Sequence, residues 1–157
     1  MELGLPGGAL EQRERPAVAE WFVNRYEHTL DAKGRVILPA KFRKAFAQGG
    51  YLTQHDDGCL ALWTPGAFRE RIESVQNRAA ESRDNRNLAR VWASRTCELD
   101  MDPQGRITIP AHQRDFAGLA GEVIVNGAID RVELWEPGRF HEVVEPSERL
   151  LSEGGDI

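Results

Sequence analysis

An internal duplication is the feature that most constrains the fold of this chain. The segments "DAKGRVILPAKFR" (31–43) and "DPQGRITIPAHQR" (102–114) share six of thirteen residues in register. Average residue usage would give about one match over such a window. A second pair, "LALWTPGAF" (60–68) and "VELWEPGRF" (132–140), aligns at a displacement of 72 residues, against 71 for the first pair. The chain is therefore built from two related halves.

The length of 157 residues fits one domain, or two small halves that share a core. A half of about 70 residues would bury too little surface to be stable alone, so we expect the halves to pack on each other. No apolar run approaches the roughly 18 residues of a membrane span. The N-terminal segment contains acids and lacks the apolar core of a secretory signal, so we expect a cytoplasmic protein.

Turn and periodicity signals repeat in the same order in the two halves. The strands that we expect are at 25–30, 35–39, 51–54, 59–63, 97–101, 106–110, 122–126 and 131–135. Short helices are expected at 39–46, 110–119 and 136–144. Between the halves, Thr64 is a candidate N-cap before Pro65, and an apolar stripe at helical spacing follows.

These signals divide the chain into five parts. They are a disordered N-terminal extension (1–20), a first half (21–68), a helical connector (69–96), a second half (97–140) and an acidic C-terminal tail (141–157). The net charge of −5 comes from the two ends, because the remainder holds 17 basic and 16 acidic residues. Within 28–46 five cations stand against one acid, which predicts a cationic face.

The repeated Asp-x-x-Gly-Arg unit predicts two hairpin turns. Asp31 and Asp102 can accept hydrogen bonds from nearby backbone amides, and Gly34 and Gly105 can adopt positive φ, so these four residues are expected to organise the turns. The arginine that follows each glycine would lie at the end of a hairpin. Its planar set of donors suits phosphate oxygens and guanine edges, but it could also serve only as an ion-pair partner of the aspartate.

A cluster of polar side chains around these turns forms the candidate nucleic-acid surface. The candidate contacts are Arg35, Arg106, Lys33, Lys41, Arg43, Lys44, Gln104 and Arg114. The second copy is less cationic, because Gln104, His112 and Asp115 stand where the first copy has lysine. We therefore expect the first half to supply more of the electrostatic binding energy.

The other conspicuous residues favour structural roles. Trp63 and Trp135 occupy matching positions at strand ends, which favours core packing over stacking on bases. The arginines of the connector are expected to form a solvated helix face, with contacts to a neighbouring subunit or to DNA as the alternative. Cys59 and Cys97 are expected to be reduced thiols. The sequence shows no metal-ligand spacing, nucleotide-binding loop or catalytic constellation, so we expect no metal, cofactor, small-molecule substrate or enzymatic activity.

The motifs "LDAKGRVILPAKFR", "MDPQGRITIPAHQR", "LWTPGAF" and "LWEPGRF" resemble the MraZ family of tandem SpoVT-AbrB proteins over about residues 21–140. The resemblance implies a mainly β, α+β fold in which the halves form a pseudo-dimeric, swapped-hairpin, double-split β-barrel with a helical insert. By the same resemblance, Asp31 with Arg35 and Asp102 with Arg106 would be the DNA-contacting pairs. The extension over 1–20 and the weakly cationic second copy depart from the family pattern.

The resemblance also implies a function. Such a protein would be a nucleoid-associated repressor that binds short direct repeats in double-stranded DNA upstream of its own division and cell-wall gene cluster, and would assemble into a multi-subunit ring. Several basic faces held in one ring could bind successive repeats even if each face binds weakly. The alternative is an antitoxin-like or scaffold ring that uses the same barrel to bind proteins.

Overall fold

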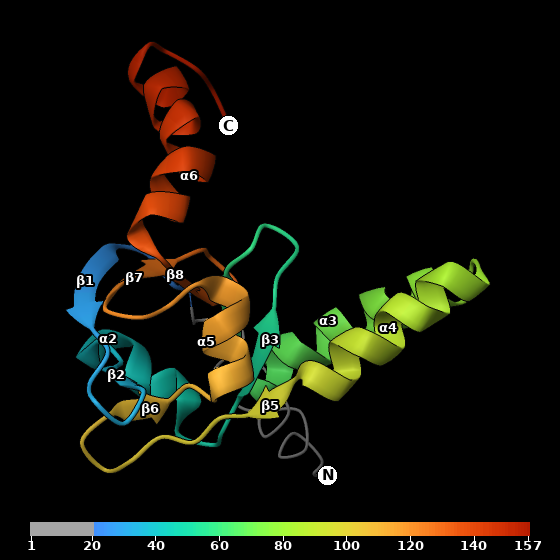
Figure 1. Ribbon diagram of the computed structural model, residues 1–157. Coiled ribbons are helices and arrows are strands. Elements are labelled where there is room, and N and C mark those ends of the chain that lie inside the picture. Colours follow the sequence, from blue (N-terminus) through green and yellow to red (C-terminus); the bar gives the residue numbers. More distant parts are fainter. Residues whose placement is uncertain (1–20) are drawn as a thin grey trace, which may run out of the picture.

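The computed structural model describes residues 21–157, and the extension expected over 1–20 lies outside these described residues. The strands are β1 (Arg25–Thr29), β2 (Arg35–Ile37), β3 (Tyr51–Gln54), β4 (Leu60–Trp63), β5 (Cys97–Glu98), β6 (Arg106–Thr108), β7 (Glu122–Gly127) and β8 (Val132–Trp135). The helices are α2 (Ala40–Arg43), α3 (Pro65–Ala79), α4 (Arg83–Arg95), α5 (Ala111–Ala117) and α6 (Pro137–Ser152). The fold is therefore mixed α/β (Figure 1).

Both sheets combine strands from the two halves. The larger sheet has the order β1-β7-β8-β4-β3-β5, the smaller one pairs β2 with β6, and every pairing is antiparallel. The first strand of each half pairs with a strand of the other half, because β1 joins β7 and β5 joins β3. At the centre, β4 pairs with its own counterpart, β8. Each half therefore completes the sheet of the other.

The larger of two hydrophobic clusters joins the two sheets and draws on both halves. Its buried members from the strands include Leu52, Leu60, Leu62, Val123, Val125, Val132 and Leu134 from the larger sheet and Val36 and Ile107 from the smaller one. Trp63 and Trp135 are also buried, which confirms their predicted place in the core. Their indole N–H groups donate to Thr53 Oγ1 (2.9 Å) and Glu133 Oε1 (3.0 Å), so these buried donors are satisfied.

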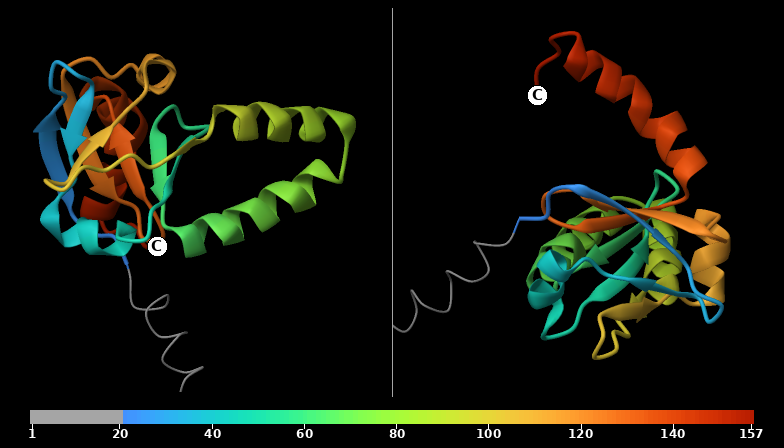
Figure 2. Two further views of the ribbon diagram at one scale, coloured as in Figure 1. Left: turned by 90° about the horizontal axis from the view of Figure 1, so that it is seen from below. Right: turned by 90° about the vertical axis from the view of Figure 1, so that its left-hand side faces the viewer.

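Helices α3 and α4 pack against each other and project from the sheet as a hairpin, which we call the arm (65–95) (Figures 1 and 2). The arm begins at the predicted cap, where the Thr64 hydroxyl accepts a hydrogen bond from the amide of Ala67 at 3.2 Å. Aromatic stacking fixes its base: the ring centroids of Tyr51 and Phe68 are 4.0 Å apart, and those of Phe68 and Trp92 are 5.8 Å apart.

Three elements differ from the sequence prediction. The helix expected over 39–46 is the short helix α2 followed by a 3-10 turn, Lys44–Phe46. The strand expected over 97–101 pairs with β3 only over β5 (Cys97–Glu98), and Met101 forms an isolated bridge with Ile107. The last helix continues past 144 to Ser152, so most of the expected acidic tail (141–157) is helical.

Candidate nucleic-acid interface

The first of two equivalent hairpin turns, which we call tip 1 (31–35), joins β1 to β2. Asp31 Oδ1 accepts hydrogen bonds from the backbone amides of Lys33 and Arg35, each at 2.9 Å. The amide of Gly34 donates to the Asp31 carbonyl at 3.0 Å, and its φ of +76° is a conformation that disfavours any residue with a Cβ. The carboxylate and the glycine together therefore determine the shape of the turn.

Tip 2 (102–106) repeats this geometry before β6. Asp102 Oδ1 accepts from the amides of Gln104 and Arg106, each at 2.9 Å, and Gly105 has a φ of +86°. The amide of Gly105 donates to the Asp102 carbonyl at 3.0 Å, as in tip 1. The duplicated sequence thus forms a duplicated local structure.

The carboxylates of Asp31 and Asp102 are held in their charged form. The backbone amide of the arginine four residues later donates a hydrogen bond that lowers the pKa of each carboxyl group, and the arginine side chain lowers it further. Partial desolvation opposes this effect but does not reverse it. Both groups are therefore anionic acceptors at neutral pH.

Each aspartate also holds the arginine that follows its glycine. Arg35 Nε donates to Asp31 Oδ2 at 2.7 Å, and Arg106 Nε donates to Asp102 Oδ2 at 2.7 Å. Each of these bonds uses the Nε–H of the guanidinium. The N–H groups on the two Nη atoms take no part in it. The side chains of Arg35 and Arg106 are 24% and 36% exposed, so both arginines are paired with an acid and yet remain partly accessible to solvent.

The two tips lie side by side. Arg35 Nη1 is 3.9 Å from Asp102 Oδ2 of the other tip. The amide of Leu38 donates to the Gly105 carbonyl at 2.8 Å, and the amide of Ile109 donates to the Gly34 carbonyl at 2.9 Å. Because β2 also pairs with β6, the two arginines belong to one continuous surface with a fixed spacing.

Arg43 and Arg114 have a different environment from the tip arginines. Arg43 Nε donates to the Leu38 carbonyl at 2.7 Å, and Arg114 Nε donates to the Ile109 carbonyl at 3.0 Å. Each guanidinium lies against the glycine of the opposite half: a Cβ at Gly105 would collide with Arg43, and one at Gly34 would lie 3.0 Å from Arg114 Cζ. Both side chains are half-buried and thus contact the tip of the other half.

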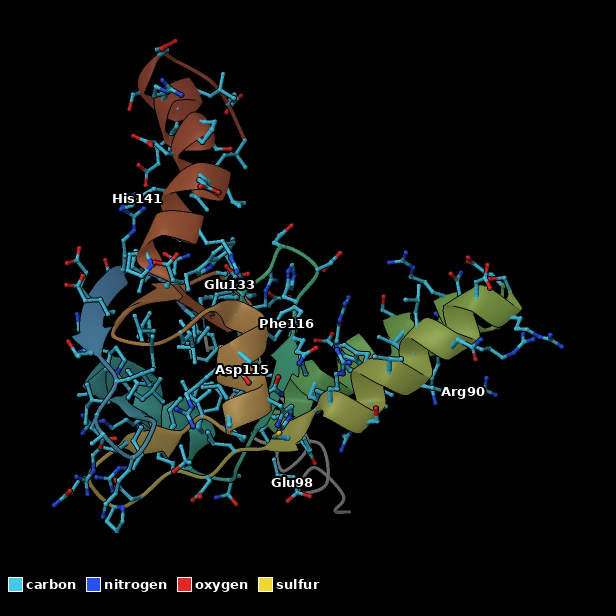
Figure 3. All side chains as sticks on the ribbon, viewed as in Figure 1. Arg90, Glu98, Asp115, Phe116, Glu133 and His141 are labelled. Atoms are coloured by element: carbon cyan, nitrogen blue, oxygen red, sulfur yellow. The ribbon has the colours of Figure 1, made fainter. Side chains whose placement is uncertain are left out.

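The remaining candidate contacts are exposed. Lys33 and Gln104 lie within the tips, Lys41 lies on α2, and Lys44 begins the 3-10 turn. On α5, His112 corresponds to Lys41 and Asp115 corresponds to Lys44. Both are also exposed, and Asp115 is labelled in Figure 3. The structure thus brings all eight candidates to the tips or to the short helices that follow them, with the greater positive charge in the first half.

The contacts of Arg43 and Arg114 with the opposite glycines were missed in the sequence, although a partial signal for them exists. Both arginines are identical between the two copies, while Lys41 and Lys44 beside Arg43 are replaced in the second copy. Retention in both copies separates these arginines from the two lysines, but it does not by itself assign a packing role, because Arg35 and Arg106 are retained as well. The partner residue, more than 60 positions away, has no local signature.

The part of the chain that the structure describes offers no metal site beside this surface. Residues 21–157 contain no group of three or more His, Cys, Asp or Glu side chains placed to hold a metal ion. Cys59 is buried, and burial raises the pKa of its thiol; Cys97 is also a free thiol, with Sγ 3.6 Å from His112 Nε2. None of the described helices is both long and apolar enough to span a bilayer.

Comparison with known proteins places the chain in a family. The model of the family described as "MraZ protein, putative antitoxin-like" matches residues 21–91 and again residues 93–154. A protein of a Nocardioides species is 41% identical over 121 residues, which are 77% of this chain and 84% of the relative. A Roseiflexus castenholzii protein is 36% identical over 123 residues, which are 78% of this chain and 86% of the relative.

A Finegoldia magna protein is 34% identical over 121 residues, covering 77% of this chain and 85% of the relative. All three relatives are named "Transcriptional regulator MraZ", a name that denotes a regulator. The double match of the family model coincides with the duplication of the sequence and with the two equivalent tips. The chain belongs to the MraZ family.

Proposed function

We propose that this chain is a transcriptional regulator that binds double-stranded DNA through the two tips. The proposal rests mainly on the arrangement of Arg35 and Arg106, each bonded to the aspartate of its own tip, side by side on one surface. The tips are close enough that Arg35 Nη1 lies 3.9 Å from Asp102 Oδ2. Two guanidinium groups at a fixed spacing can bind phosphates or guanine edges of one DNA segment together. The names of the relatives support the regulatory role.

The proposed contacts form three groups. Arg35 and Arg106 are the central donors, and their aspartates orient them. Lys33 and Gln104 flank them within the tips, and Lys41 and Lys44 extend the cationic surface along the first half. The basic side chains mainly neutralise phosphates, whereas Gln104 can also bond a base. Arg43 and Arg114 border the same surface, and we assign them to holding the tips.

The finer features of the proposal concern architecture and targets. The exchange of β1 and β5 between halves supports a swapped-hairpin, double-split barrel. The targets would be short direct repeats upstream of the chain's own division and cell-wall gene cluster, and the effect would be repression in the nucleoid. Self-association into a ring would present several tips at once, so that the affinity comes from multiple contacts.

The proposal is tested by measuring the affinity for DNA upstream of the chain's own gene, with probes carrying one repeat or several. Arg35→Ala and Arg106→Ala should weaken binding, and the loss should be greater on the multi-repeat probe. If the lost contact is to a phosphate, the slope of log affinity against log salt should fall by about 1. If it is to a base, discrimination between sequences should relax instead.

Arg90→Ala is the matched control, because it removes the same charge from an exposed arginine of the arm, away from the tips (Figure 3). It should leave affinity and salt slope close to those of the wild type. An equal loss for Arg90→Ala and Arg35→Ala would show that the tips have no special role. Absence of sequence-dependent binding by the wild type would favour the scaffold alternative.

A further inference from the structure

We propose that a groove along the arm binds helix α6 of a second copy of this chain. This inference deepens the proposed self-association by naming the two surfaces that meet. The groove, with a volume of about 350 Å³, lies between the arm, the β3–β4 turn and α5. Phe116, labelled in Figure 3, lines it from α5.

The floor of the groove is apolar and open to solvent. Val75 of α3 and Leu88, Val91 and Trp92 of α4 line it, and Leu88 is 67% exposed. Large apolar side chains grouped in this way on a surface mark an interaction site more often than isolated ones do. A groove between two packed helices suits the apolar face of a third helix.

The polar rim of the groove favours an acidic occupant. Arg71 and Arg78 line it from α3, and Asp56 is the one acid among its lining residues. The Nε of Arg71 and the Nε1 of Trp92 are buried and have no hydrogen-bond partner in the described structure. A ligand with carboxylates beside an apolar stripe would complement the charges of Arg71 and Arg78 and the floor together.

Helix α6 has these properties. Val143, Leu150 and Leu151 recur at intervals of seven and eight residues, which places them on one face, and all three are exposed. Its exposed acids are Glu142, Glu145 and Glu148, and Glu153 follows its last residue. From Val143 onward, α6 thus combines an exposed apolar stripe with negative charge, as the groove requires.

The groove and α6 of one chain cannot meet. Phe140 and Val144 fix the start of α6 on Ile124 and Trp135, and Glu148 contacts Arg25 of β1. From this anchor α6 leaves the sheet in a different direction from the arm in both Figure 1 and Figure 2. The occupant of the groove is therefore α6 of another copy.

Such a contact joins two different surfaces, the groove of one copy and α6 of another. In the resulting pair, one copy still has a free α6 and the other still has a free groove. Repetition of the contact produces a closed ring or an open chain, depending on the rotation between copies. This property allows a complementation test. A chain with a damaged groove still offers its helix, and a chain with a damaged helix still offers its groove.

The groove variant is Leu88→Asp/Val91→Asp, and the helix variant is Leu150→Asp/Leu151→Asp. All four residues are exposed, so both variants should keep the fold. Circular dichroism can verify this. Light scattering coupled to size exclusion should show a multi-subunit wild type and a monomer for each variant alone. An equimolar mixture should give a one-to-one dimer, because one intact contact remains. The matched control, Ile129→Asp, alters an exposed apolar residue elsewhere and should retain the wild-type size.

The outcomes separate this inference from the proposed self-association. Variants that keep the wild-type size would overturn the groove as the interface and leave self-association intact. Monomeric variants that do not form a dimer when mixed would overturn the pairing of groove with helix. A monomeric wild type would overturn the inference and the proposed self-association together, while DNA binding by the tips is measured independently.

Discussion

At the scale of single residues, the aspartate of each tip serves the backbone and the arginine at once. In tip 1, one carboxylate oxygen accepts from two amides and the other accepts from the Nε of Arg35. An asparagine could accept from the amides but would present no charge to the guanidinium. Because a charge-assisted hydrogen bond is shorter and stronger than a neutral one, only Asp holds both groups in place.

The pH dependence of the tips follows from the lowered pKa of Asp31 and Asp102. A carboxyl pKa that is lower in the folded state stabilises the fold above the unfolded value of about 3.9, and this contribution is lost as the pH falls through the lowered value. We expect the amide signals of Lys33 and Gln104 to stay constant from neutral pH to below about pH 4 in an NMR titration.

Asp31→Asn is the control for this titration, since it removes the titrating group from tip 1 and leaves tip 2 intact. The Gln104 amide should then still titrate in acid, while the Lys33 amide should not. A midpoint at or above the ordinary carboxyl value in the wild type would contradict the prediction. Because both carboxylates stay ionised between pH 6 and 8, their titration should not change DNA binding in this range.

At the scale of secondary structure, the short helices after β2 and β6 stabilise the tips crosswise. Arg43 ends α2 of the first half and lies against tip 2, while Arg114 of α5 lies against tip 1. The helix of each half thus supports the tip of the other half. Loosening one helix should affect the distant tip more than the nearby one.

Lysine substitutions test this crossed support, because they keep the charge and remove the planar Nε–H donor. In Arg43→Lys we expect faster hydrogen exchange at the Gly105 amide, and in Arg114→Lys at the Gly34 amide. The expected increase is about 5-fold, which corresponds to ~1 kcal/mol for a lost hydrogen bond. Lys41→Arg, at an exposed neighbour of Arg43, should change neither amide.

Exchange that rises only in the tip of the mutated half would contradict this assignment. So would a large loss of DNA affinity without any change in exchange, because that result indicates a direct contact. The readout does not depend on DNA binding, so it remains informative if the proposed function is wrong.

The elements with local signals were the ones predicted well. The strands at Tyr51–Gln54 and Leu60–Trp63, the turn between them and the cap at Thr64 lie where residue type and spacing place them. Helix α6 was predicted too short. Proline is unfavourable inside helices, yet Pro146 lies within α6, and Leu150 and Leu151 continue beyond it the apolar face that begins at Val143.

At the scale of the whole molecule, the exchange of strands between halves makes the core indivisible. Leu60 of β4 lies opposite Leu134 of β8, and both are fully buried in the cluster that draws on β3, β4, β7 and β8. Neither half has a complete sheet without the other. We therefore expect residues 21–63 and 97–135 to unfold as one cooperative unit.

Leu134→Ala should lower the free energy of unfolding by about 2–5 kcal/mol, because it leaves a cavity in the shared core. Hydrogen exchange under denaturant should show that β3 and β7 lose protection together and to the same extent. The control, Leu88→Ala on the exposed arm, should change stability by no more than about 0.5 kcal/mol. Selective loss of protection in β7 would show that the halves unfold separately.

The sequence by itself determined the twofold repeat, the two turn shapes, and the position of most strands and caps. These features depend on interactions within about four residues, such as an aspartate with the next amides or a glycine at positive φ, so residue type and spacing encode them. Only the tertiary structure decided that β1 pairs with β7, that Arg43 and Arg114 contact the opposite tip, and that a groove opens beside the arm. The alternation of apolar and polar residues in a strand is the same whichever strand it pairs with, and the type of a residue does not identify its distant partner. The packing of the whole chain therefore selects these contacts.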